Sequence, residues 1–174
     1  MDEKASAQAN GKHEILDSLD LEFARLHSRS CTIIESTRID ILYAGGESRR
    51  VSGGSPARSV GDSVLRSAAT IEQTFGGITS NLWDDPFEWT LPEYLSTPAK
   101  VIDHLEEVEA TRKRAFSSFS DDSCLLKRVA TPSKATQPLV ELLLETLVRA
   151  RNFQSEAIVT LKNLSGISRP GFII

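Results

Sequence analysis

The chain has 174 residues, of which 40% are hydrophobic and 25% are charged, and its formal net charge is -4. This length and composition are ordinary for one globular domain that buries its core without disulfides or metals. The negative charge provides no field that would attract nucleic acid or an anionic membrane surface, so we expect neither as a partner.

Targeting and redox signals are weak in this sequence. Residues 1–12 are polar and lack the apolar segment of a signal peptide, and no apolar run approaches the length of a membrane span. We expect a disordered tail at 1–12, a single domain at 13–168, a short tail at 169–174 and a cytoplasmic location. Cys31 and Cys124 have no CxxC spacing, so we expect reduced, partly buried thiols.

The first predicted helix runs from Leu16 to Ala44, where apolar residues recur at steps of three and four. A Gly45-Gly46 pair ends it. Residues 31–43 are rich in β-branched types, and residues 37–41 alternate polar and apolar, so a short strand is the alternative there. The glycine-rich segment that follows, up to Arg58, is expected to be a loop.

The second predicted helix begins at Ser59, with Asp62 completing a weak form of the capping box. Its apolar stripe has the most regular period in the chain and consists of Val60, Val64, Ala68, Ile71, Phe75, Ile78 and Leu82.

The segment from Asn81 to Ser96 contains both tryptophans and two prolines, and it is longer than adjacent antiparallel helices require. We expect it to cross the end of a helical bundle and to pack its aromatic side chains there. Thr97 then caps a third helix with Pro98 at its first position. Arg112 interrupts the apolar face of this helix.

The last predicted helix runs from Thr136 to Leu164, with Pro138 in its first turn and Gly166 beyond its end. Its stripe comprises Leu139, Leu143, Thr146, Ala150, Phe153, Ala157, Leu161 and Leu164. The sequence therefore predicts an all-α fold, a four-helix bundle with a long crossover between the second and third helices.

Polar residues beside the stripes of the second and last helices are the candidate site. If these two flanks face each other, Arg66 and Arg149 would line a cavity that holds a small anion by charge-assisted hydrogen bonds. The alternative is that both flanks are solvated faces of amphipathic helices. The candidate ligand-binding residues are Arg66, Thr70, Thr146, Arg149, Asn152 and Phe153.

The three histidines, His13, His27 and His104, each stand alone on their predicted elements. No HxxxH or HExxH spacing occurs, so no helix presents two imidazoles to one metal. We therefore expect no metal and no cofactor, and the sequence identifies no catalytic residue.

Two segments resemble helices of the DinB/YfiT-like superfamily, bacterial four-helix bundles with a long connection between the second and third helices. They are SVGDSVLRSAATIEQTF at Ser59–Phe75 and LLLETLVRARNFQSEAIVTLKNLSG at Leu142–Gly166. In that family, one histidine of the second helix and two of the last usually bind a divalent metal.

The resemblance assigns the histidine of the second helix to the position of Arg66. It assigns the two histidines of the last helix to Arg149 and Phe153, or to positions within one residue of them. Arginine has no lone pair to donate to a metal. The resemblance therefore implies a metal-free member whose remodelled pocket binds a small anionic ligand or is a vestige. An atypical thiol-dependent transferase, a metal-dependent hydrolase-like enzyme and a homodimeric interaction module are the alternatives, and the sequence leaves open whether the chain is an enzyme.

Overall fold

The computed structural model describes residues 13–44, 58–89, 94–132 and 136–165. Its four helices confirm the predicted all-α four-helix bundle, and they are α2 (Glu14–Glu35), α3 (Val60–Ser80), α4 (Pro98–Ser117) and α5 (Leu139–Ser165). The smaller elements are the 3-10 helices η1 (Pro86–Trp89) and η2 (Asp122–Leu126) and the strands β1 (Arg128–Ala130) and β2 (Thr136–Pro138). The predicted tails and most of the predicted glycine-rich loop lie outside the described residues.

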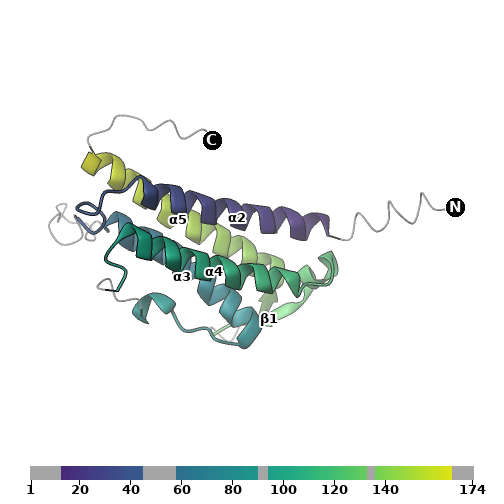
Figure 1. Ribbon diagram of the computed structural model, residues 1–174. Helices are drawn as coiled ribbons and strands as arrows, with labels where there is room; N and C mark the ends of the chain where they lie inside the picture. Colours follow the sequence, from purple (N-terminus) through teal and green to yellow (C-terminus); the bar gives the residue numbers. More distant parts are fainter. Residues whose placement is uncertain (1–12, 45–57, 90–93, 133–135, 166–174) are drawn as a thin grey trace, which may run out of the picture.

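The direction of the helices explains the long connection (Figure 1). α2 and α5 run one way along the bundle, and α3 and α4 run the other way. The chain must therefore return along the bundle between the end of α3 and the start of α4, and η1 lies on this return path. The long crossover is confirmed, but it runs along the bundle and does not cross its end as predicted, because α3 and α4 point the same way.

Packing between the helices defines two opposite edges of the bundle. α3 packs mainly on α5 and also on α4, whereas α2 packs on α4 and on α5. The α3–α5 edge and the α2–α4 edge therefore lie on opposite sides of a shared core. Phe23 and Phe75 meet edge to face in this core at 5.1 Å between ring centroids, and both are fully buried. Burial of each such ring contributes roughly 1.5–3 kcal/mol.

The predicted starts of the middle two helices are confirmed. The Ser59 hydroxyl accepts a hydrogen bond from the Asp62 amide at 3.0 Å, and Thr97 is the cap before Pro98. α3 ends at Ser80 because Asn81 adopts the left-handed conformation, with φ at 55°. The chain turns there, and Leu82 is 62% exposed, so its predicted place in the core stripe is wrong.

α2 ends at Glu35, before the predicted boundary at Ala44. Residues 36–44 form turns, so both the longer helix and the alternative strand are wrong. The Thr37 hydroxyl donates to the Ile33 carbonyl at 2.6 Å, and the Thr37 amide donates to Ile34. Such local bonds compete with continuation of a helix.

α5 begins at Leu139, and the predicted start at Thr136 is wrong. Residues 136–138 form β2, which pairs antiparallel with β1. A residue before a proline prefers extended backbone, so Pro138 holds Gln137 in the strand instead of the helix. Most of the predicted apolar stripe of α5 is confirmed, since Leu139, Leu143, Ala150, Ala157 and Leu161 are all buried. Phe153 and Leu164 are only partly buried.

Each described helix is too short or too polar to cross a membrane.

Candidate functional site

Arg66 of α3 and Arg149 of α5 line the same small cavity at the α3–α5 edge. Its volume is about 50 Å³, and Thr70 and Phe153 contribute to its wall. Four of the six predicted site residues therefore meet at one place. The other lining residues, which the sequence did not identify, are Ala69, Gln73, Asp85 and Phe87.

The guanidinium group of Arg66 is held by an aromatic ring and not by a carboxylate. It lies over Phe87 with its central carbon 3.8 Å from the ring centroid, which is within the range of a cation–π contact. Its Nε is buried and has no hydrogen-bond partner among the described residues. Within the same residues, neither Arg66 nor Arg149 forms an ion pair. The cavity thus contains guanidinium groups with donors that have no partner in the described part of the chain.

One acidic residue shares this cavity. Asp85 precedes η1, and its Oδ1 accepts a hydrogen bond from the Phe87 amide at 3.0 Å. This bond fixes the start of η1, which carries the ring beneath Arg66. The single carboxylate offsets part of the charge of the two arginines and leaves the cavity cationic.

A neighbouring cavity of about 220 Å³ shares Gln73 and Arg149 with the first. Thr146 lines this second cavity, where its hydroxyl lies 2.8 Å from that of Thr74 on α3. Both hydroxyls are buried, so Thr146 joins two helices and also borders the cavity. Arg149 stands between the two cavities.

Asn152 does not join the other predicted residues. It borders a third cavity, together with Glu22 and Leu26 of α2. Along an α-helix, residue 152 lies on the side of Arg149 that is turned away from Thr146. The sequence placed Asn152 at this site because it is three residues from Arg149, but the helical rotation carries it towards α2.

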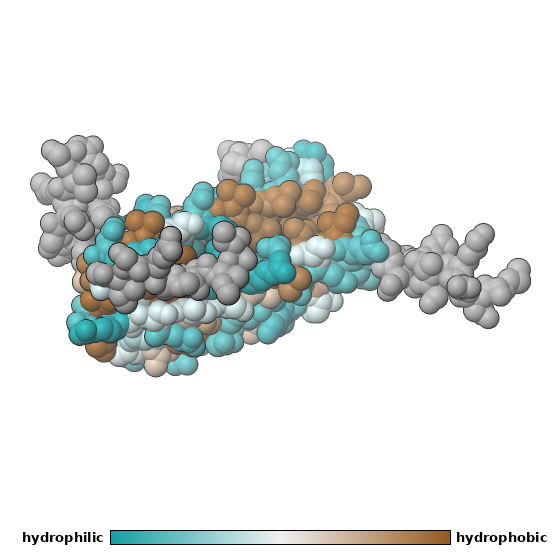
Figure 2. Space-filling view, turned by 90° about the horizontal axis from the view of Figure 1, so that it is seen from above, coloured by the Kyte–Doolittle hydropathy of each residue, from teal (hydrophilic) through white to brown (hydrophobic). Residues whose placement is uncertain are grey.

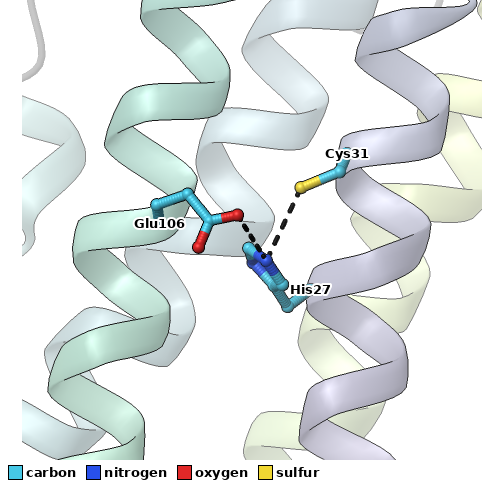
Figure 3. A group of neighbouring side chains, drawn as sticks. All are labelled: His27, Cys31 and Glu106. Carbon is cyan, nitrogen blue, oxygen red and sulfur yellow. Dashed lines mark hydrogen bonds and ion pairs between the residues drawn. The ribbon is translucent and has the colours of Figure 1, made fainter.

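A different polar cluster lies at the α2–α4 edge (Figure 3). The Nε2 atom of His27 lies 3.2 Å from Oε1 of Glu106 and 3.7 Å from Sγ of Cys31. The three donor atoms all lie within 4.8 Å of one another. No second histidine accompanies His27 in this cluster, but a thiol and a carboxylate lie beside it, and the sequence analysis did not predict them.

The sequence carried a signal for part of this cluster. His27 and Cys31 are four residues apart, which places both side chains on the same face of one helix. A search for imidazole pairs does not detect this His-x3-Cys spacing. Glu106 comes from a distant helix, so only the packing of α4 on α2 brings it to the pair.

The Cys31 thiol is not a ready nucleophile. Burial, followed by the negative charges of Glu106 and Glu35, raises its pKa to about 11. The thiol is therefore protonated at neutral pH, whereas the thiolate is the reactive form. Cys31 and Cys124 are both free thiols, as predicted.

Arg112, which interrupts the predicted apolar face of α4, is only 1% exposed. Its Nε and Nη2 donate to the two carboxylate oxygens of Glu109, each at 2.7 Å, and its Nη1 donates to Asp20 of α2. Burial raises the pKa of Glu109, but the hydrogen bonds and charge of Arg112 outweigh it, and the pKa is lowered overall. This arginine is a structural link between α2 and α4.

A wider cleft of about 580 Å³ lies between α3, the crossover and α4. Its wall includes Glu72, Asp84 and Arg114, so it carries charges of both signs. Burial raises the pKa of Glu72. The mixed charge of this cleft favours no single class of ligand.

Comparison of the chain with protein-family models, curated proteins and solved structures gives no match.

Proposed function

We propose that this protein binds a small oxyanion between α3 and α5, in the cavity lined by Arg66 and Arg149. The observation that carries the proposal is the presence of two guanidinium groups on one cavity with no ion pair to either of them in the described parts of the chain. The buried Nε of Arg66 has no partner there either, and a buried donor without a partner costs about 1–3 kcal/mol. An anion in the cavity would remove this cost only if the guanidinium group turned to bring Nε to the cavity surface.

The chemistry of the ligand follows from size and charge. A cavity of about 50 Å³ has room for only a few water-sized groups, which suits a phosphate, a sulfate or a carboxylate. Guanidinium groups recognise such oxyanions by paired hydrogen bonds. The adjoining cavity beyond Arg149 could hold the remainder of a larger molecule that carries this group.

We also propose that the protein is a member of the DinB/YfiT-like superfamily that lacks the usual metal of that family. The positions assigned to the family's metal ligands are Arg66, Arg149 and Phe153, and all three line one cavity. Their proximity supports the assignment of those positions. Two arginines and a phenylalanine offer no lone pair for a metal and instead make a cationic, partly apolar pocket.

Calorimetric titration with inorganic phosphate at low ionic strength tests the proposal. We expect saturable binding to one site, and we expect Arg66→Gln and Arg149→Gln each to weaken it by about 10-fold to 150-fold, the range for a hydrogen bond to a charged group. Arg151→Gln is the matched control, because Arg151 is an exposed arginine on the same helix and borders another cavity. Equal affinity in all three variants would contradict the proposal.

The same titration with a low-molecular-weight thiol that carries carboxylates distinguishes a thiol-dependent transferase from a simple anion-binding protein. Binding that depends on Arg66 and Arg149 for both ligands would place the thiol in the proposed pocket. Phosphate binding without thiol binding favours the simple anion site.

The exposed apolar surface favours a homodimer as a second candidate. Figure 2 shows apolar residues gathered on the face formed by α2 and α5. Leu21 of α2 and Leu144 and Val148 of α5 are at least half exposed. We expect the mass in sedimentation to rise with concentration and Val148→Glu to abolish this rise. A monomeric mass at every concentration would contradict the dimer and leave the anion proposal unaffected.

A further inference from the structure

We propose that His27, Cys31 and Glu106 form a binding site for a divalent transition metal, Zn²⁺ in the first instance, at the α2–α4 edge. The site is separate from the arginine cavity, which lies at the opposite edge of the bundle. It also uses none of the positions that the DinB-like resemblance assigns to a metal.

Two of the three distances between the donor atoms match tetrahedral coordination. With Zn–N and Zn–O near 2.05 Å and Zn–S near 2.3 Å, tetrahedral ligands lie about 3.3 Å apart for N and O and about 3.6 Å apart for N and S. The observed separations are 3.2 Å for His27 Nε2 to Glu106 Oε1 and 3.7 Å for His27 Nε2 to Cys31 Sγ. The third pair, Cys31 Sγ and the Glu106 carboxylate, lies within 4.8 Å, so this pair would have to close to about 3.6 Å for one zinc ion to bond all three atoms.

Hydrogen bonds alone do not explain why the side chains of His27, Cys31 and Glu106 lie together. Both contacts of His27 use the same ring nitrogen, Nε2. If Nε2 carries a proton and donates it to Glu106, it cannot accept the thiol proton of Cys31. If Nε2 is unprotonated, its lone pair faces the Glu106 carboxylate. A metal ion satisfies the lone pairs of all three atoms at once.

The surroundings of the cluster suit a cation and leave it accessible. The side chain of Glu106 is 62% exposed and that of His27 is 17% exposed, so an ion can reach the site from solvent. Three protein ligands leave a fourth position for water or a small ligand, as in zinc sites that are not purely structural. Binding replaces the thiol proton of Cys31, which passes to solvent. Imidazole and thiolate ligands favour Zn²⁺ over Mg²⁺ or Ca²⁺.

Zinc titration against a chromophoric chelator tests the site. The untagged full chain, kept reduced, should bind one zinc ion. We expect the zinc affinity to fall at least 100-fold in each of three variants, His27→Gln, Cys31→Ser and Glu106→Gln. Loss of a residue that only supports a metal ligand lowers affinity by about 10-fold to 100-fold, so a larger loss indicates direct ligation. Glu107→Gln is the matched control, because Glu107 is the neighbouring exposed carboxylate on α4 and lies outside the cluster. Its affinity should equal that of the wild type.

Glu106→Gln keeps the test decisive even if a variant of the less exposed Cys31 folds poorly, since Glu106 lies on the surface. Circular dichroism melting of each metal-free variant identifies such a failure. Arg66→Gln should bind zinc normally, which separates this proposal from the oxyanion site. Absence of zinc binding, or equal affinity in Glu106→Gln and Glu107→Gln, would overturn the proposal.

Cobalt provides a second readout that reports on the thiolate. The Co²⁺ complex should show a near-ultraviolet band from sulfur-to-cobalt charge transfer, and Cys31→Ser should lose it. Cys124→Ser should retain it, because Cys124 lies in η2, outside the cluster. A band that disappears with Cys124, or a cobalt complex without the band, would contradict ligation by Cys31.

Discussion

The two edges of the bundle use arginine in opposite ways. At the α2–α4 edge, Arg112 is buried and its three donor nitrogens bond to Glu109 and Asp20. At the α3–α5 edge, Arg66 packs on the Phe87 ring, and its buried Nε has no partner among the described residues. The partners of an arginine, more than its burial, therefore distinguish a structural link from a group that is available to a ligand.

The distribution of charge follows the same division. At the α2–α4 edge, Arg112 is matched by Glu109 and Asp20, and Glu106 adds a negative charge where the proposed cation site lies. Two arginines and one aspartate give the α3–α5 cavity a net positive character. The bundle thus presents sites of opposite sign across one apolar core.

The largest expected effect comes from removing the structural arginine. Arg112→Ala should lower the free energy of unfolding by about 3–5 kcal/mol, because it removes both hydrogen bonds to the buried Glu109 carboxylate and leaves only the exposed Lys113, 3.5 Å away, as its cation. Urea denaturation measures this change.

Two controls accompany that measurement. Arg38→Ala breaks an ion pair in which the arginine side chain is 78% exposed, and we expect a change within about 0.5 kcal/mol. Arg66→Gln should also cost less than Arg112→Ala. A loss at Arg66 as large as that at Arg112 would contradict the distinction between the two edges.

Acidification should weaken the same network. The pKa of Glu109 is lowered in the folded protein from its ordinary value of 4.5. The Glu109 carboxylate therefore contributes fully to the free energy of unfolding above that pH, and this contribution is lost as the pH falls through the folded pKa. The urea midpoint should therefore fall below about pH 4.5. The pKa of Glu72 is raised in the folded protein, so acidification stabilises the fold through this residue. Measuring the urea midpoint against pH in a protein that carries Glu72→Gln removes this opposing effect. Equal acid sensitivity with and without Arg112→Ala would exclude this network as the cause.

A smaller effect than that of Arg112→Ala is expected at the polar contact that joins α3 and α5. Thr146→Val removes a hydroxyl that lies 2.8 Å from Thr74, but Thr74 can still donate to the Thr70 carbonyl at 3.0 Å. We expect a loss of about 0.5–1.5 kcal/mol in urea denaturation. Thr32→Val removes an exposed hydroxyl on α2 and should cost less. A loss at Thr146 comparable to that at Arg112 would show that this edge also depends on a buried polar link.

The sequence predicted the helices better than their ends. The regular stripe of α3 and the caps at Ser59 and Thr97 identify those elements correctly, because periodicity and capping are local. The end of α2 was missed because the bond from Thr37 to Ile33 does not alter the apolar period. The start of α5 was missed because a proline fits either a first helical turn or the end of a strand.

The site residues show the same limit. The facing flanks that contain Arg66 and Arg149 could be predicted because each flank lies beside a clear stripe on its own helix. Arg112 interrupts a stripe as a surface residue would, and its burial depends on Asp20, a residue of another helix. The meeting of His27 with Glu106 likewise depends on how two helices pack, which no local spacing determines.

The most direct test of the oxyanion site is the nuclear magnetic resonance signal of the arginine Nε–H groups during a phosphate titration. The Arg66 signal should shift and saturate, because phosphate bound to the guanidinium group would change the surroundings of its Nε–H group. The Arg112 signal should remain unchanged, because its Nε already donates to Glu109 at 2.7 Å. An Arg66 signal that stays fixed, or that moves only in proportion to the exposed Arg38 without saturating, would contradict the proposed site.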